Sequence, residues 1–187
     1  MTTKKAVMVY DPVAIEKKNK AFARMSAKRK RLAIAADVIE QVRLKRFTAE
    51  QNVYVGIDAL RDYKESIVYE SAALQQFLVY PPKNAVSCTV CGIGAIVLSK
   101  AKLGNEVVLK HRYFHEALED IFSERQQCLI ETAFEGYNSG PYSWSDDENE
   151  EANPAAVKFY RKYAGNDDKR LVAIFRNILK NDGEFKP

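Results

Sequence analysis

The sequence contains few glycines and prolines, only three cysteines and no long hydrophobic run. Eight Gly and six Pro among 187 residues, with 47% hydrophobic and 29% charged residues, are typical of a globular chain rather than a disordered one. The longest apolar run, Val90–Ser99, is about half as long as a helix that spans a bilayer. A chain of this length predicts a single domain, 1–187, with its own core.

The odd number of cysteines argues against a secreted protein, because a disulfide framework uses cysteines in pairs. The first twenty residues are basic and polar, without the apolar stretch of a secretory signal. We therefore expect a cytoplasmic protein whose thiols are reduced and which has no membrane partner.

The sequence also lacks the common catalytic motifs. The pair Gly92 and Gly94 is not followed by the third glycine and the Lys-Ser/Thr ending of a phosphate-binding loop, and no serine lies in a Gly-x-Ser-x-Gly context. Cys128 beside a histidine could act as a nucleophile, and grouped carboxylates could hold a metal or act on glycosides. The grouped carboxylates are Glu116, Glu119 and Asp120, and further on Glu131 and Glu135. We interpret the thiol as helix packing and the carboxylates as solvated helix faces, and we predict that the protein is not an enzyme.

Apolar residues repeat at helical spacing along most of the chain, and short signals mark where the helices begin and end. Asp11-Pro12 begins the first helix, since Asp can cap a helix and Pro suits its first turn. Ser123 with Gln126 matches a capping box, and its helix ends at Gly136. The other predicted helices are Leu32–Leu44, Asp58–Val79, Tyr113–Ile121, 154–163 and Asp167–Leu179. The pattern predicts a mainly α, single-domain helical bundle of about seven helices with at most a minor β element.

The segment 86–103 is predicted to be the central helix of this bundle. It is apolar on nearly all sides, Ser87 can cap it and Gly104 ends it. Thr48–Glu50 is predicted to be a turn, and Asn52–Val55 has strand propensity. Three further segments are predicted to lie outside the helices: a possible arm at 1–10, a long acidic and aromatic loop at 137–153, and a tail at 183–187.

Two cysteines three residues apart, Cys88 and Cys91, have the spacing of a zinc knuckle. His111 and His115, the only histidines in the sequence, follow in the order that a Cys-x2-Cys…His-x3-His site needs. However, the segment between the two pairs is longer than a finger linker and has the start and stop signals of its own helix. We therefore predict that both thiols are buried in helix contacts and that no metal or other cofactor is bound. A zinc-stabilised regulator that uses these four residues remains an alternative.

Positive charge is concentrated at the amino-terminal end. Residues 1–46 contain 13 Lys and Arg against four acidic residues, whereas the rest of the chain is net acidic. On one continuous helix, cations spaced three or four residues apart form a stripe that could follow nucleic-acid phosphates. These cations are Lys17, Lys20, Arg24, Lys28 and Arg31, within the basic stretch 17–31. No helix-turn-helix, zinc-finger or RNA-recognition signature accompanies them, so nucleic-acid binding is an alternative rather than the leading hypothesis.

The long loop contains the residues that we predict to bind a partner protein. Exposed aromatic side chains beside carboxylates are typical of protein interfaces. The residues are Tyr142, Trp144, Asp146, Asp147 and Glu148. The basic helix face is the second candidate contact surface.

The segments Arg31–Ile57, Ser87–Lys100 and Phe122–Gly136 resemble small uncharacterised proteins encoded by bacteriophages and related mobile elements. The resemblance implies a setting, the bacterial cytoplasm during infection, and assigns no activity, cofactor or site residue. Our leading hypothesis is therefore a non-enzymatic protein-binding module: a phage accessory factor that modulates or inhibits a host or defence protein complex.

Overall fold

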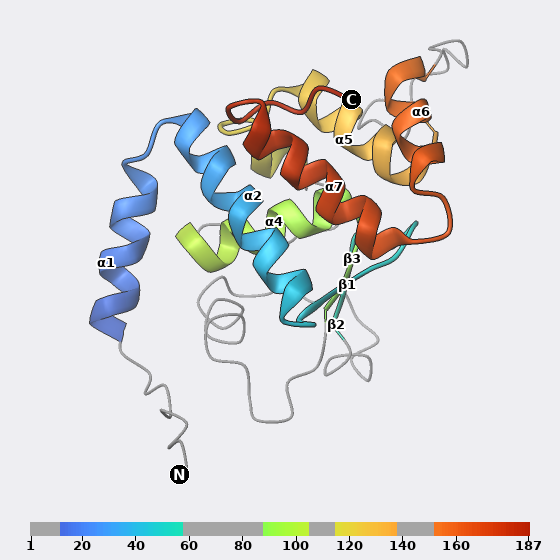
Figure 1. Cartoon of the computed structure of the whole chain (residues 1–187). Coiled ribbons are helices and arrows are strands. Elements are labelled where there is room, and N and C mark those ends of the chain that lie inside the picture. The colour runs from blue at the N-terminus through green and yellow to red at the C-terminus, as the bar shows by residue number, and fades with distance from the viewer. Residues whose placement is uncertain (1–11, 58–87, 105–114, 138–151) are drawn as a thin grey trace.

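A computed structural model gives the structure of the protein and describes residues 12–57, 88–104, 115–137 and 152–187. Six α-helices, one 3-10 helix and three short strands lie in these ranges (Figure 1). The helices are α1 (Pro12–Ala23), α2 (Ala27–Arg43), α4 (Gly92–Gly104), η2 (Glu116–Leu118), α5 (Glu124–Glu135), α6 (Pro154–Lys162) and α7 (Asp167–Lys180). The strands are β1 (Phe47–Ala49), β2 (Val55–Ile57) and β3 (Cys88–Val90).

The mainly α fold with a minor β element is confirmed, with six α-helices in the described part of the chain against about seven predicted. The predicted helix Asp58–Val79 lies outside the described residues. Of the predicted helix Tyr113–Ile121, the described part contains only the 3-10 helix η2. Among the described residues, no helix combines the length and the apolar character that crossing a membrane requires.

Helix α4 is buried along most of its length. Every residue from Gly92 to Ser99 is buried. Helices α1, α2 and α5 contact α4, and α2 lies beside α7 on one side of it (Figure 1). The apolar stretch Gly92–Ser99 suits this position, because these residues are removed from water on every side of the helix.

The predicted start of the central helix is wrong, because residues Cys88–Val90 form β3 and α4 begins only at Gly92. Strand β3 lies between β1 and β2, parallel to β1 and antiparallel to β2. The backbone groups of β3 are therefore hydrogen-bonded to a strand on each side. These bonds stabilise the extended conformation of Cys88–Val90, although the sequence pattern of this apolar run favours a helix. The turn predicted at Thr48–Glu50 is also wrong, since Phe47 pairs with Cys88 and Ala49 pairs with Val90.

The predicted helix ends are mostly correct, because they depend on local capping groups. Ser123 Oγ accepts a hydrogen bond from Gln126 N at the start of α5, and Asn153 caps α6 in the same way. Gly136 ends α5 with φ 88°, a left-handed conformation that glycine adopts without steric cost. On α7 the predicted apolar face is buried, at Leu171, Ile174, Phe175 and Ile178.

The last residues pack against the body of the protein. Phe185 is buried, and its ring contacts the ring of Phe159 edge-on with centroids 5.3 Å apart. Gln126 on α5 holds the backbone of Phe185 with both groups of its amide: Oε1 accepts from Phe185 N at 2.6 Å, and Nε2 donates to Phe185 O at 3.2 Å. Asn177 on α7 bonds the backbone of Lys186 in the same two-bond manner.

Candidate functional site

The loop residues predicted to bind a partner lie outside the described residues. They are Tyr142, Trp144, Asp146, Asp147 and Glu148. The same holds for His111, one of the four zinc ligands of the alternative hypothesis. The remaining predicted site residues are described and can be placed.

The five stripe cations lie on two helices rather than on one continuous helix, so this prediction is wrong. Lys17 and Lys20 lie on α1, Arg24 lies in the connection, and Lys28 and Arg31 lie on α2. The break follows from Ser26, whose Oγ accepts a hydrogen bond from Arg29 N and so begins a new helix.

Three of these five cations already have partners in the structure. Lys20 pairs with Glu16 at 2.6 Å, and Lys28 pairs with Asp182 near the carboxyl terminus. Arg31 is half-buried and donates to two backbone oxygens, Gly183 O at 2.6 Å and Ile121 O at 2.7 Å. Arg31 therefore holds elements of the fold together rather than facing a ligand.

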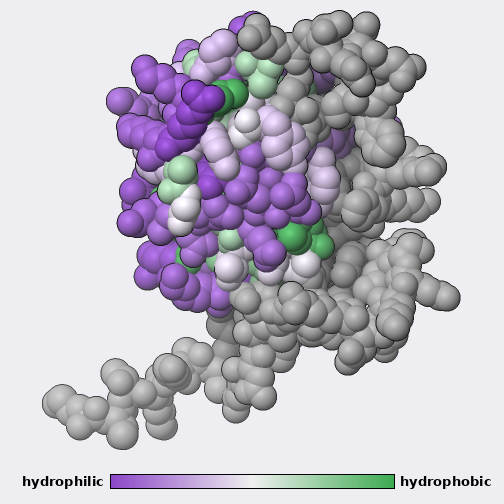
Figure 2. Space-filling view, turned by 90° about the vertical axis from the view of Figure 1, so that its right-hand side faces the viewer, coloured by the Kyte–Doolittle hydropathy of each residue, from purple (hydrophilic) through white to green (hydrophobic). Residues whose placement is uncertain are grey.

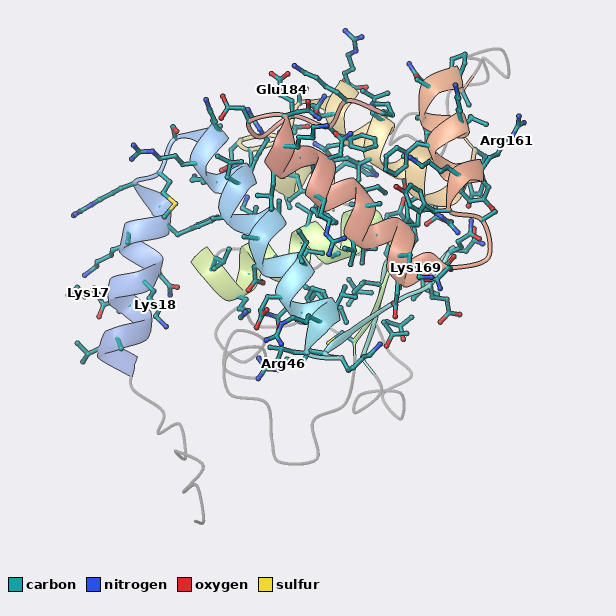
Figure 3. All side chains as sticks on the ribbon, viewed as in Figure 1. Lys17, Lys18, Arg46, Arg161, Lys169 and Glu184 are labelled. Atoms are coloured by element: carbon teal, nitrogen blue, oxygen red, sulfur yellow. The ribbon has the colours of Figure 1, made fainter. Side chains whose placement is uncertain are left out.

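The two remaining stripe cations, Lys17 and Arg24, together with Lys18 and Arg29, form what we call the basic surface. All four side chains are exposed and have no ion pair with another residue of the described ranges. A second group of exposed cations comprises Lys158, Arg161 and Lys162 on α6 and Lys169 at the start of α7. Lys17 and Lys18 lie on the opposite side of the molecule from Arg161 and Lys169 (Figure 3). The described residues on the face that carries α6 are mostly hydrophilic, with small scattered hydrophobic spots (Figure 2).

The two knuckle cysteines are both buried, as predicted, but only Cys91 adjoins the helix. Cys88 lies in β3, and Cys91 lies between β3 and α4, where its Sγ accepts from Gly94 N at 3.4 Å. Burial raises the pKa of the Cys91 thiol to about 12, so the thiol is neutral at physiological pH. Within the described ranges no three His, Cys, Asp or Glu side chains are grouped so that they could hold a metal ion.

The structure also contains a group of buried and half-buried polar side chains that the sequence analysis did not find, and we call it the buried polar cluster. It consists of Tyr54, His115, Gln127, Glu131 and Glu135. On α5, the three residues spaced four apart are 1%, 2% and 5% exposed in chain order. The prediction of a solvated face is therefore wrong for Glu131 and Glu135.

The error has a simple physical reason. Helix α5 contacts α4, α6 and α7, so the face that carries these carboxylates is turned into the molecule. By contrast, Glu116, Glu119 and Asp120 are exposed, as predicted. The sequence did contain one indication that these residues lie together. Gln127, Glu131 and Glu135 are spaced four apart, and residues at that interval share one helix face.

Within the buried polar cluster, hydrogen bonds join Tyr54 to Glu131 and His115 to Gln127, while Glu135 bonds the backbone of a neighbouring segment. Tyr54 donates its hydroxyl hydrogen to Glu131 Oε1 at 2.7 Å. His115 Nδ1 lies 2.8 Å from Gln127 Oε1, and His115 Nε2 lies 3.4 Å from Glu131 Oε2. Glu135 Oε2 accepts from the backbone N–H of Asn52 at 3.0 Å. The cluster therefore links α5 to the segment before β2 and to the segment before η2.

Burial changes the acidity of several of these groups. It raises the pKa of Glu135 to about 7, because a carboxylate loses its hydration there. Burial, followed by the neighbouring Glu131, raises the pKa of Tyr54. Burial lowers the pKa of His115, although the Gln127 side chain acts in the opposite direction. Groups with such shifted pKa values are often functional, but they also occur in structural networks.

Comparisons with known proteins give no relative for this arrangement: no family model, no curated protein and no solved structure matches the chain.

Proposed function

We propose that this protein is a non-enzymatic binding protein that engages an acidic surface of a partner protein through its basic surface. The observation that carries the proposal is that four exposed cations, on α1, in the connection after it and at the start of α2, have no acidic partner in the described part of the chain. Cations left unpaired on a surface create a local positive potential, which speeds and orients the approach of an acidic partner.

A protein partner is favoured over nucleic acid by the composition of this region. Glu16 lies among the lysines of α1, and Val13 on the same helix is 73% exposed. Carboxylates repel phosphates, whereas mixed apolar and charged side chains are usual in protein interfaces. The break at Ser26 also divides the stripe that would follow a phosphate backbone.

The structure fixes the carboxyl end of α1 against the body of the protein. Phe22 is 5% exposed, and any side chain at Gly104 would collide with its ring. Lys30 on α2 lies over the same ring at 5.8 Å. The basic surface is thus presented on an anchored helix, which reduces the entropy lost on binding.

As its setting we propose the bacterial cytoplasm, where the protein would act as a phage accessory factor that inhibits or modulates a host or defence complex. The resemblance to phage-encoded proteins supports this part of the proposal. The aromatic and acidic loop around Trp144 and Tyr142 is proposed as a second contact surface, on the basis of its composition.

The test compares two variants that lose the same charge. One replaces Lys17, Lys18, Arg24 and Arg29 with Gln, and the control replaces Lys158, Arg161, Lys162 and Lys169 with Gln. Tagged proteins are used to capture partners from nuclease-treated bacterial lysate, and affinity is then measured with the purified partner. We expect the basic-surface variant to lose about tenfold or more in affinity, and the control to lose little.

Equal losses in both variants would show that net charge, and not this surface, determines binding. Capture that is seen from untreated lysate but not from nuclease-treated lysate, with affinity falling steeply as salt rises, would instead establish nucleic-acid binding. A third variant, Tyr142→Ala with Trp144→Ala, tests the loop: if the loop contributes, capture is lost while the melting temperature stays unchanged. Retained capture by this double variant would remove the loop from the proposal.

A further inference from the structure

Helix α7 carries a row of cations on the side that faces away from the core. The row consists of Lys169, Arg176 and Lys180, and all three residues are exposed. Their positions in the sequence place them within about 40° of one line along the helix, and that line is about 16 Å long. The residues buried on the opposite side include Leu171 and Ile174. We call this set of three cations the α7 row.

The α7 row has no ion pair with another residue of the described ranges. By contrast, two exposed cations on the neighbouring helix α2 are neutralised by the protein itself. Lys28 pairs with Asp182, and Arg43 pairs with Glu40 at 2.6 Å. The positive charge of the α7 row is therefore available to an anion from outside the protein.

The two carboxylates of α7 do not compensate this charge, because each is held by other groups of the protein. Asp167 Oδ1 accepts a hydrogen bond from Arg170 Nη2 at 2.6 Å. Asp168 Oδ1 accepts from the backbone N–H of Ala49 at 2.8 Å, and its Oδ2 lies 3.9 Å from Lys45 Nζ. The outward side of α7 is therefore basic.

The stability of α7 does not explain the row. Lys169 lies in the first turn, where the helix dipole disfavours a cation. Arg176 and Lys180 are four residues apart, a spacing at which like charges on a helix repel each other. Only Lys180, in the last turn, suits the dipole. An anion bound along the row would relieve both unfavourable interactions.

We infer that the α7 row binds the phosphate backbone of double-stranded DNA without reading its sequence. A duplex carries one negative charge for about every 1.7 Å of its axis, so a row of this length meets several phosphates. Each phosphate that a cation neutralises releases a condensed counterion, and this release supplies sequence-independent affinity. Contacts to phosphates position a protein on the duplex and carry no sequence information.

Three observations favour a duplex over other anionic partners. Single strands are held by exposed rings that stack on the bases, whereas the one exposed aromatic residue of the described ranges, Tyr137, follows α5. A helix that lies on a lipid surface exposes several large apolar side chains, but α7 exposes only Leu179. Glu16 lies among the lysines of α1, whereas no carboxylate interrupts the α7 row.

The α7 row is separate from the basic surface that we propose for a partner protein. Lys17 and Lys18 lie on the opposite side of the molecule from Lys169 (Figure 3). The inference therefore does not depend on the proposed function, and either surface can fail its test alone. If both surfaces bind as proposed, the protein can hold DNA and its partner at the same time.

The test measures binding of the purified full chain to a fluorescent duplex of about 20 base pairs, from about 50 to about 200 mM salt. The row variant replaces all three residues of the α7 row with Gln. The matched control replaces Lys158, Arg161 and Lys162 with Gln, which removes the same charge from α6, a helix that packs on α5. Melting temperatures of both variants should match that of the wild type, since only exposed side chains change.

We expect the row variant to lose about tenfold or more in affinity at about 50 mM salt, and the control to lose about threefold or less. The plot of log affinity against log salt should become shallower by about 2–3 in the row variant, because each lost phosphate contact removes about 0.9 from the slope. Lys169→Arg with Lys180→Arg keeps the charge and should bind as the wild type does.

Absence of wild-type binding to the duplex at about 50 mM salt would overturn the inference, as would equal losses in the two Gln variants. Tighter binding of a single strand of the same sequence would also overturn it. Stronger row-dependent binding to vesicles that contain phosphatidylserine would assign the α7 row to a lipid surface instead.

Discussion

At the scale of single residues, Glu135 makes stability depend on pH. Burial raises its pKa to about 7, so the folded chain holds the proton more strongly than the unfolded chain, whose carboxyl has a pKa near 4.5. The stability that this proton preserves is complete below pH 4.5 and is lost as the pH rises through 7. Between pH 4.5 and pH 8 the free energy of unfolding of the wild type should fall by about 2 kcal/mol relative to that of Glu135→Gln. This value is smaller than the full pKa shift would give, because the carboxylate keeps part of its hydration.

Urea unfolding at pH 4.5, 6 and 8 measures this difference, and Glu119→Gln is the control. Glu119 is exposed, so removing its charge should leave the pH dependence as it is in the wild type. If the curves for the wild type and Glu135→Gln run parallel from pH 4.5 to 8, the carboxyl of Glu135 titrates as an ordinary solvated one.

The same carboxylates show which residues sequence analysis can and cannot place. Leu171 and Phe175 were placed correctly because an apolar repeat has one stable orientation, toward the core. Glu131 was placed wrongly because a carboxylate in water is the common case, and burial of Glu131 depends on Tyr54, which lies 77 residues away in the chain. A contact between residues so far apart in the sequence cannot be predicted from a local pattern.

At the scale of elements, features that depend on neighbouring residues in the sequence could be predicted, whereas features that depend on distant residues could not. Helix ends at Ser123, Asn153 and Gly136 were predictable, since a cap needs only its own neighbours. Strand β3 was not predictable, because Cys88–Val90 is extended only through its pairing with two strands from residues 47–57. Gly94 illustrates the same dependence: a Cβ there would lie 1.5 Å from Tyr54 O, so the start of α4 needs glycine for a reason that its own sequence does not show.

The carboxyl-terminal segment should behave as an integral element of the fold. Phe185 is 1% exposed and both of its backbone groups bond to Gln126. Phe185→Ala removes a buried ring and should reduce the free energy of unfolding by about 3–4 kcal/mol. Lys186→Ala is the control in the same segment. Because the Lys186 side chain is exposed, its removal should lower the free energy of unfolding by about 0.5 kcal/mol or less. Urea unfolding of both variants checks this, and equal, small losses would mean that the segment adds nothing to stability.

At the scale of the whole molecule, the remaining question is whether the fold depends on a bound metal. The buried residues form one continuous core that extends from Phe22 on α1 to Phe185 near the carboxyl terminus, and it includes both Cys88 and Cys91. A core of this extent supplies the main driving force for folding by itself. Both thiols lie inside this core, and Cys91 Sγ accepts a hydrogen bond from Gly94 N, so packing alone accounts for their burial.

We therefore expect protein purified without chelator to contain much less than one zinc per chain by elemental analysis. Dialysis against EDTA should leave the melting temperature unchanged within about 2 °C, since a shift of that size corresponds to about 0.5–1 kcal/mol in a domain this large. The matched variant is Cys88→Ser with Cys91→Ser, which removes the two thiols and, as a substitution in the core, lowers the melting temperature with or without EDTA. One zinc per wild-type chain, together with a lower melting temperature in EDTA that the double variant does not show, would establish the zinc-stabilised alternative and require His111 and His115 to act as ligands.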